Sequence, residues 1–104
     1  IGSVDLRCID DAVPSFEIGY WIRSDRAGMG LAHEFVTAAI GVARESLRAE
    51  RIEARCDVRN ERSWRLAERL GFVFEGISRN DSRDASGALC STKVYALVTS
   101  PGAR

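Results

Sequence analysis

Lysine is almost absent from this chain of 104 residues: Lys93 is the only one, and every other basic residue is an arginine. Basic and acidic residues number 15 each, so the formal net charge is zero. Nucleic-acid-binding domains usually carry a strongly basic surface, so this balance argues against such a partner. No signal peptide is visible in the sequence, and no apolar run approaches the length of a membrane helix. We therefore expect a cytoplasmic protein with no membrane partner.

Cysteine is scarce as well, with Cys8, Cys56 and Cys90 widely spaced and no C-x-x-C pair. An odd number at this spacing excludes a disulfide framework and a cysteine-based zinc site. We expect no metal. Cys8 and Cys56 fall in apolar alternations, which predicts that they are small buried side chains. The chain opens on Ile1 without a methionine, directly in a strand pattern, so we expect that an upstream segment has been removed.

The remaining pattern predicts one α+β domain over residues 1–98, followed by a tail over 99–104. Period-two alternation predicts strands over 4–8, 16–22, 52–58, 72–77 and 89–98. The first two strands are expected to pair antiparallel, and the last two to form a hairpin with a long connection over 78–87. The predicted order is β-β-α-β-α-β-β, a mixed sheet with two helices, and the third strand is expected to be a parallel neighbour of the second.

Helical periodicity predicts one helix over 31–48 and a short second one between Asn60, as N-cap, and Gly71, as left-handed C-cap. The apolar face predicted for the first helix consists of Leu31, Phe35, Ala38, Ala39 and Val42.

The segment Arg26-Ala27-Gly28-Met29-Gly30-Leu31-Ala32 stands between a strand and a helix. Two glycines let the backbone turn tightly and approach a ligand, and the helix N-terminus offers unpaired N–H groups to a phosphate. The alternative is a glycine-rich turn that only starts a helix. A P-loop is excluded because no lysine stands here, and a dinucleotide fingerprint fails at its last position, His33.

Four ordered motifs carry a family resemblance: Phe16-Glu17-Ile18-Gly19-Tyr20-Trp21-Ile22, Gly28-Met29-Gly30-Leu31-Ala32, Asn60-Glu61-Arg62-Ser63, and Leu70-Gly71-Phe72 with Glu75-Gly76. Together they resemble the GNAT superfamily of acyltransferases, in particular the branch of the bacterial ribosomal-protein N-terminal acetyltransferases. The similarity runs from Ile1 to about Leu97. The family's N-terminal strand, helices and second strand have no counterpart, so the resemblance implies the GNAT fold in an N-terminally truncated form.

The resemblance implies that acetyl-coenzyme A is the co-substrate and assigns residues to it. Backbone groups of Tyr20, Trp21 and Ile22 would pair with the pantetheine arm, and the N–H groups near Trp21 and Ile22 would stabilise the oxyanion. Asn60 would hydrogen-bond the same arm, with helix capping as the alternative. The pyrophosphate would be wrapped by Ala27, Gly28, Met29, Gly30, Leu31, Ala32 and His33, although Ala27 replaces the usual Gln or Arg.

For catalysis, the resemblance implies that Ser63 protonates the departing thiolate. Ala67 stands where many relatives carry a tyrosine acid. Glu17 is the candidate general base, because an amine must be neutral to attack a thioester. A solvated or salt-bridged strand residue is the alternative for Glu17, and Glu53 and Asp57 are weaker candidates.

Two functions from different classes remain. The first is transfer of an acetyl group from acetyl-coenzyme A to a primary amine, either a protein N-terminus or a small amine. The second is a truncated, non-catalytic module that binds coenzyme A or acts through oligomerisation. An unpaired sheet edge and exposed apolar surface favour a homodimer, with or without strand exchange. The arginines at 55, 59, 62, 65 and 69 alternate with acids and predict a solvated charged face.

Overall fold

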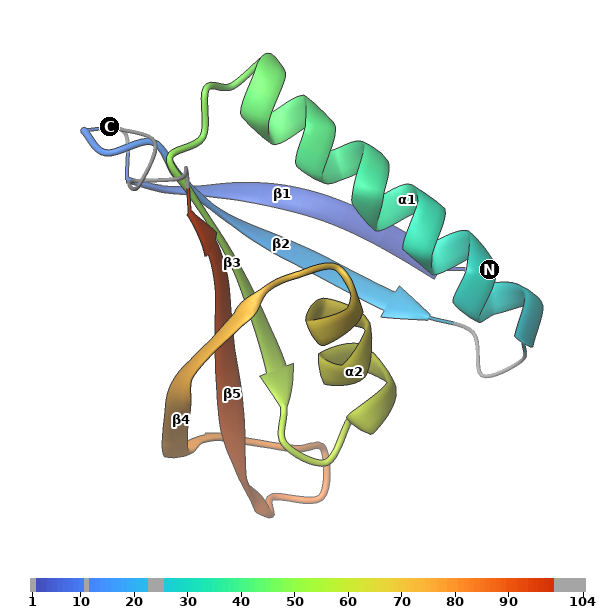
Figure 1. Cartoon of the computed structure of the whole chain (residues 1–104). Helices are drawn as coiled ribbons and strands as arrows, with labels where there is room; N and C mark the ends of the chain where they lie inside the picture. Colours follow the sequence, from blue (N-terminus) through green and yellow to red (C-terminus); the bar gives the residue numbers. More distant parts are fainter. Residues whose placement is uncertain (1, 11, 23–25, 99–104) are drawn as a thin grey trace.

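The computed structural model describes residues 2–10, 12–22 and 26–98. The chain forms a five-stranded sheet with two helices (Figure 1) in the predicted order. The elements are β1 (Gly2–Asp10), β2 (Ser15–Ile22), α1 (Arg26–Glu45), β3 (Arg51–Asp57), α2 (Glu61–Arg69), β4 (Val73–Arg83) and β5 (Leu89–Val98). The predicted α+β class is confirmed.

The sheet is mixed, with strand order β1-β2-β3-β5-β4. β1 pairs antiparallel with β2, and β5 lies antiparallel between β3 and β4. β2 and β3 are parallel and are joined through α1, as the sequence predicts. The parallel pair therefore lies inside the sheet.

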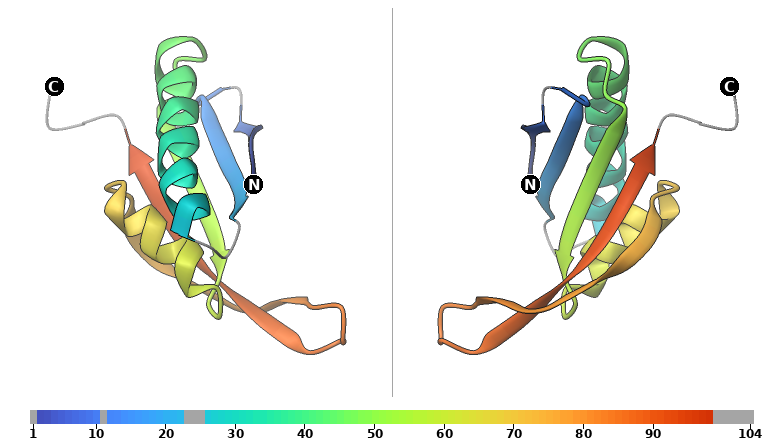
Figure 2. Two further views of the ribbon diagram at one scale, coloured as in Figure 1. Left: turned by 90° about the vertical axis from the view of Figure 1, so that its right-hand side faces the viewer. Right: turned by 90° about the vertical axis from the view of Figure 1, so that its left-hand side faces the viewer.

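Both helices cover the same face of the sheet (Figures 1 and 2), and one apolar cluster joins them to it. Ile18, Ile52, Ala54 and Tyr95 supply the inward side chains of three central strands, and each is 2% exposed or less. The residues between them on the strands, such as Glu17, Glu53 and Arg55, point to the opposite face. One face is thus apolar and covered, and the other is charged.

Helix α1 buries a different stripe from the one predicted. Its buried residues are Ala32, Val36, Ile40 and Ala43, whereas Phe35 and Val42 are 46% and 50% exposed. Apolar residues occupy both stripes, which differ by about 100° around the helix axis. Sequence periodicity therefore permits either stripe, and the contacts of α1 with β1 and β2 decide between them.

The boundaries of α1 and β4 also differ from expectation. The helix begins at Arg26 rather than Leu31, because two glycines lower helix propensity by only about 1 kcal/mol each and no proline intervenes. Strand β4 continues to Arg83, since irregularities between Ser78 and Ser82 let it keep pairing with β5. The sequence predicts a long connection over 78–87, but the observed connection is shorter and spans residues 84–88.

The end of α2 follows the prediction. Gly71 has a φ of 92°, its amide donates to the Glu68 carbonyl, and the Phe72 amide donates to the Ala67 carbonyl. These two bonds make a Schellman motif, which needs a left-handed residue after the C-cap.

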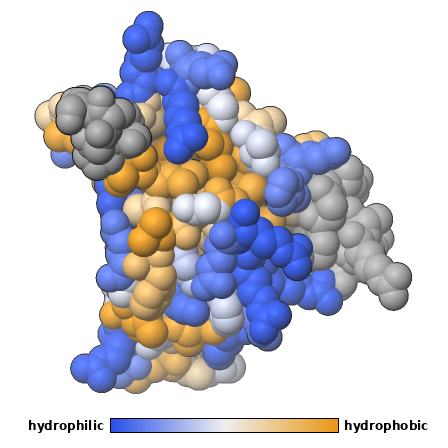
Figure 3. Space-filling model, viewed as in Figure 1, coloured by the Kyte–Doolittle hydropathy of each residue, from blue (hydrophilic) through white to orange (hydrophobic). Residues whose placement is uncertain are grey.

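Apolar side chains reach the surface at several places, and Figure 3 shows apolar surface between the polar parts of the helix-bearing face. Cys56 is buried as expected, but Cys8 is exposed on the edge strand β1, which corrects its assignment to the core. No helix in the described ranges is both long and apolar enough to cross a membrane. The large exposed apolar residues are Ile9, Val13, Phe35, Val42, Leu47, Val73, Phe74, Ile77, Leu89 and Val98.

The contrast between two isoleucines tests this core. Ile52 on β3 is 1% exposed and Ile77 on β4 is 50% exposed. Ile52→Ala should lower the free energy of unfolding by about 2–5 kcal/mol, because it removes buried methyl groups and leaves a cavity. Ile77→Ala, the matched control, should cost less than about 1 kcal/mol. Urea denaturation measures both, and equal losses would contradict the assignment of the core.

Candidate acyl-coenzyme A site

The parallel strands β2 and β3 separate before either of them ends. Their register runs from Ser15 opposite Arg51 to Ile18 opposite Ala54, and no pair follows among the described residues of these strands. Yet β2 continues to Ile22 and β3 to Asp57, each still paired on its outer side. Figure 1 shows the two ribbons diverging from this point. On the side of β2 that faces β3, the backbone N–H and C=O groups of Gly19–Ile22 therefore have no hydrogen-bond partner in β3.

The N-terminus of α1 follows the free end of β2 after a short connection. The first four amides of a helix have no intrahelical acceptor and lie at the positive end of its dipole. Gly28 and Met29 lie in this first turn, while the amides of Gly30 to His33 have helix carbonyls four residues before them. The amides of this first turn are the groups that the segment can offer to a phosphate.

Tyr20 reaches from β2 to α2 on the helix-bearing face. Its hydroxyl donates to the Ser63 carbonyl at 2.8 Å and lies 4.0 Å from Cys56 Sγ. Burial raises the pKa of Tyr20, so the phenol stays protonated at neutral pH and keeps donating. Burial also raises the pKa of the Cys56 thiol. Neither group supplies an anion to this face.

Asn60 and Ser63 open helix α2. The Asn60 side-chain oxygen accepts from the Ser63 amide at 3.3 Å, which is the geometry of an N-cap. Asn60 is exposed, whereas Ser63 is 5% exposed on the inward face of the helix, together with Leu66 and Ala67. Capping thus accounts for the side-chain oxygen of Asn60, and the residue also lines a shallow hollow together with Asp57 and Arg59.

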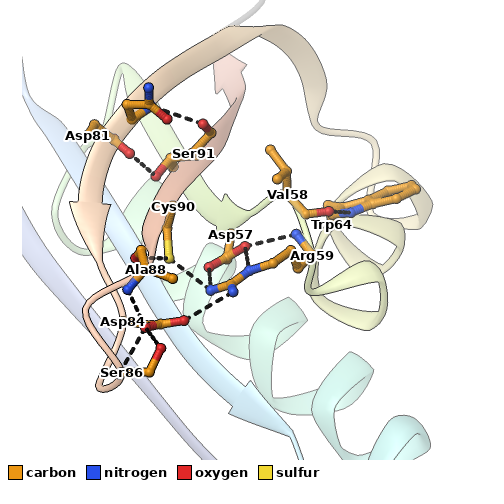
Figure 4. Close-up of polar contacts among 12 residues, drawn as sticks. Asp57, Val58, Arg59, Trp64, Asp81, Asp84, Ser86, Ala88, Cys90 and Ser91 are labelled. Carbon is orange, nitrogen blue, oxygen red and sulfur yellow. Dashed lines mark hydrogen bonds and ion pairs between the residues drawn. The ribbon is translucent and has the colours of Figure 1, made fainter.

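Arg59 fixes the segment between β3 and α2 (Figure 4). Its guanidinium binds both oxygens of Asp57, at 3.1 and 2.9 Å, and Asp84 in the β4–β5 turn at 3.1 Å. Hydrogen bonds from Arg59 lower the pKa of Asp57 to about 2. Ser86, then Arg59, hold the pKa of Asp84 below its usual range. Charge therefore ties the turn of the last hairpin to the residue that precedes Asn60.

Glu17 lies on the other face of the sheet. Ile18 points into the core, so its neighbour Glu17 points away from the helices, where it pairs with Arg7. Directly opposite on β3, Glu53 is bound by Arg51 at 2.9 Å. The geometry of Glu17 therefore fits the alternative stated from the sequence, a salt-bridged strand residue.

The structure brings Tyr20, Asn60 and Ser63 together at the point where β2 and β3 separate. It does not bring Glu17 to their face. The hydroxyl of Tyr20 is a contact that sequence reasoning missed, because only its backbone was assigned a role. Its one signal is a tyrosine at an inward position of an otherwise apolar alternation, where a buried hydroxyl needs a partner.

The other charged candidates are distributed over the surface. His33 is exposed. The arginines are exposed and several are ion-paired, but they do not share one face: Arg55 pairs with Glu53 on the helix-free face of the sheet, whereas Arg65 pairs with Glu61 on α2. Among the described residues, no group of three His, Cys, Asp or Glu side chains is placed to hold a metal ion.

Removing the Arg59 guanidinium tests the electrostatic tie. Arg59→Met should raise the pKa of Asp57 from about 2 toward the unperturbed value of about 3.9. Because the folded-state pKa is depressed, this carboxylate stabilises the fold above about pH 4 and loses that effect as the pH falls toward 2. NMR titration of the Asp57 carboxyl measures the shift. Arg65→Met, whose partner is Glu61, is the control and should leave Asp57 unchanged.

The sequence matches the acetyltransferase (GNAT) domain family over residues 1–73. It is 34% identical over 98 residues to the uncharacterized N-acetyltransferase p20 of Bacillus licheniformis, covering 94% of this chain and 54% of that protein. It is 32% identical over 76 residues to the ribosomal-protein-serine acetyltransferase of Escherichia coli (strain K12), covering 73% and 42%. The chain spans about half the length of the relatives that it matches.

The fold is shared with a solved structure of the microcin C7 self-immunity acetyltransferase MccE in complex with acetyl-CoA and AMP. The TM-score is 0.74 at 27% identity, over 88% of this chain and 50% of that one. That relative binds acetyl-CoA, the ligand that the motifs in β2, α1 and α2 imply. The family match and the relatives agree, and the chain belongs to the GNAT acetyltransferases, related to the ribosomal-protein acetyltransferases.

Proposed function

We propose that this chain carries the acyl-coenzyme A site of an N-acetyltransferase, which moves an acetyl group to a primary amine. The observation that carries the proposal is the separation of β2 from β3 after Ile18 and Ala54, next to the start of α1. An extended pantetheine arm could add to the free edge of β2 as a further strand does, with hydrogen bonds to Tyr20, Trp21 and Ile22.

The pyrophosphate would lie at the N-terminus of α1. The first turn of α1, which includes Ala27, Gly28 and Met29, supplies free amides as donors. The helix dipole favours the negative charge. Because these are backbone contacts, alanine in place of Gln or Arg at position 27 is tolerated. Gly30, Leu31, Ala32 and His33 continue the helix and hold that turn in place.

In the proposed reaction the neutral amine attacks the thioester carbonyl, so a C–N bond forms and the C–S bond breaks. Backbone N–H groups near Trp21 and Ile22 stabilise the oxyanion. The departing thiolate takes a proton from Ser63, which regains one from water, and the amine loses one to a base that releases it to water. Glu17 is the proposed base. Its place on the helix-free face implies that the acceptor approaches from the side opposite the coenzyme.

The acceptor is proposed to be a protein N-terminus or a small amine. The alternative, a non-catalytic module acting through oligomerisation, is favoured by one observation: large apolar side chains are exposed at several places in the described ranges. A homodimer would cover part of that surface. The free cysteines fit a reducing compartment, and we propose the cytoplasm.

Calorimetric titration with acetyl-coenzyme A tests the proposal. NADH, which has a pyrophosphate but no pantetheine arm, is the control ligand. Binding of acetyl-coenzyme A, with little or none of NADH, supports a site built on the free edge of β2. If millimolar acetyl-coenzyme A gives no heat of binding, this chain is not an acyl-coenzyme A site.

Asn60 allows its two roles to be separated. Asn60→Ser keeps a capping oxygen but removes the amide nitrogen, whereas Asn60→Ala removes both. We expect Asn60→Ser to keep its melting temperature while the Kd for acetyl-coenzyme A rises about 3- to 10-fold, the effect of one lost hydrogen bond. Asn60→Ala should also melt earlier. Unchanged coenzyme affinity in Asn60→Ser would leave Asn60 as a cap only.

Ser63→Ala tests the leaving-group acid. We expect kcat to fall about 10²- to 10⁴-fold, the usual contribution of general acid catalysis, with coenzyme affinity unchanged. Ser82→Ala on the exposed part of β4 is the control. Full turnover by Ser63→Ala with peptide and small-amine acceptors would remove the serine from this role.

A further inference from the structure

The only lysine of the chain lies beneath helix α2. Lys93 on β5 places its ammonium nitrogen 3.5 Å from the centre of the Trp64 ring, with the rings of Phe74 and Tyr95 at 5.4 and 5.8 Å. A cation at such distances is attracted to the faces of aromatic rings. Everywhere else this chain uses arginine for positive charge, so its one compact ammonium stands where three rings converge.

A second contact also joins β5 to α2. The Tyr95 hydroxyl donates to a Glu68 carboxylate oxygen at 2.7 Å. Trp64 and Glu68 are four residues apart on α2, a rise of about 6 Å, while Lys93 and Tyr95 are two apart on β5, about 6.6–6.8 Å. The two spacings match, so α2 is attached to β5 at two points.

Helix α2 depends on such contacts. It has nine residues, too few for a helix that is stable alone in water, and it buries only Ser63, Leu66 and Ala67. The Trp64 indole nitrogen also donates to the Val58 carbonyl at 3.1 Å (Figure 4), which fixes the ring that covers Lys93. Ser63 immediately precedes that ring, so the attachment of Trp64 sets where Ser63 lies over the separated strands.

We propose that Lys93 is a positioning residue for acyl transfer: its ammonium, through Trp64, holds α2 in the register that places Ser63 beside the thioester. The proposal rests on the proposed function. Lys93 acts through the ring and not on the substrate, so its loss should affect turnover more than coenzyme binding. Tyr20, which binds the Ser63 carbonyl, holds the other side of the same turn.

Hydrogen exchange of the intact chain tests the attachment without requiring activity. Lys93→Met keeps the apolar stem and removes the charge. Amides of α2 should exchange about 2- to 30-fold faster, the range for losing one cation–π contact, while those of α1 stay unchanged. Tyr95→Phe removes only the bond to Glu68 and is the second, milder variant. Arg83→Met, whose side chain bonds the Gly87 carbonyl, is the control.

Kinetics then separate positioning from simple stabilisation. Lys93→Met should lower kcat about tenfold, since small misplacements of reacting groups are costly, and leave the Kd for acetyl-coenzyme A within twofold. Lys93→Arg, which restores a cation over the ring, should recover most of kcat. Unchanged α2 exchange in Lys93→Met overturns the proposal, as does faster exchange with unchanged kcat. A wild type that binds no acetyl-coenzyme A refutes the proposed function instead, and the exchange result still decides the attachment.

Discussion

The separation of β2 from β3 is the constraint on which the site depends. Two parallel strands that stay paired satisfy each other's backbone, and nothing can then enter between them. Here pairing stops at Ile18 and Ala54 while both strands continue. The outer neighbours β1 and β5 keep the two strands extended beyond that point, so the free edges are held by the sheet itself. The helix that joins the strands begins shortly after the free end of β2.

The two faces of the sheet divide the chemistry. On the covered face, hydroxyl and amide groups gather around the opening, and burial keeps the Tyr20 phenol protonated. On the other face, arginines pair with the carboxylates of Glu17, Glu53 and Glu75. The division keeps the charged side chains out of the apolar core, where an unpaired charge is costly.

Much of the fold could be predicted from the sequence because its determinants are local. Alternation predicts every strand, and Asn60 and Gly71 bound α2 through their own side chain and backbone. The buried stripe of α1 could not be predicted, since Val36 and Phe35 are equally apolar and only the sheet distinguishes them. Alternation also continues through Ile18 without a break, so the sequence contains no sign of where pairing with β3 stops.

The candidate site could likewise be predicted from the sequence only in part. Motif spacing places Asn60 and Ser63 on one helical turn, but the bond that joins Ser63 to Tyr20 links residues 43 positions apart. The contact of Lys93 with Trp64 likewise depends on how α2 crosses β5, which is a property of the packed structure.

The phenol of Tyr20 has a mechanical consequence. Its ring is rigid, and its hydroxyl is anchored on a carbonyl in the first turn of α2. Strand β2 therefore cannot swing further from β3 unless α2 follows or that bond breaks. The distance between the two strands and the position of the helix that carries Ser63 are therefore coupled, and the length of one tyrosine side chain sets that distance.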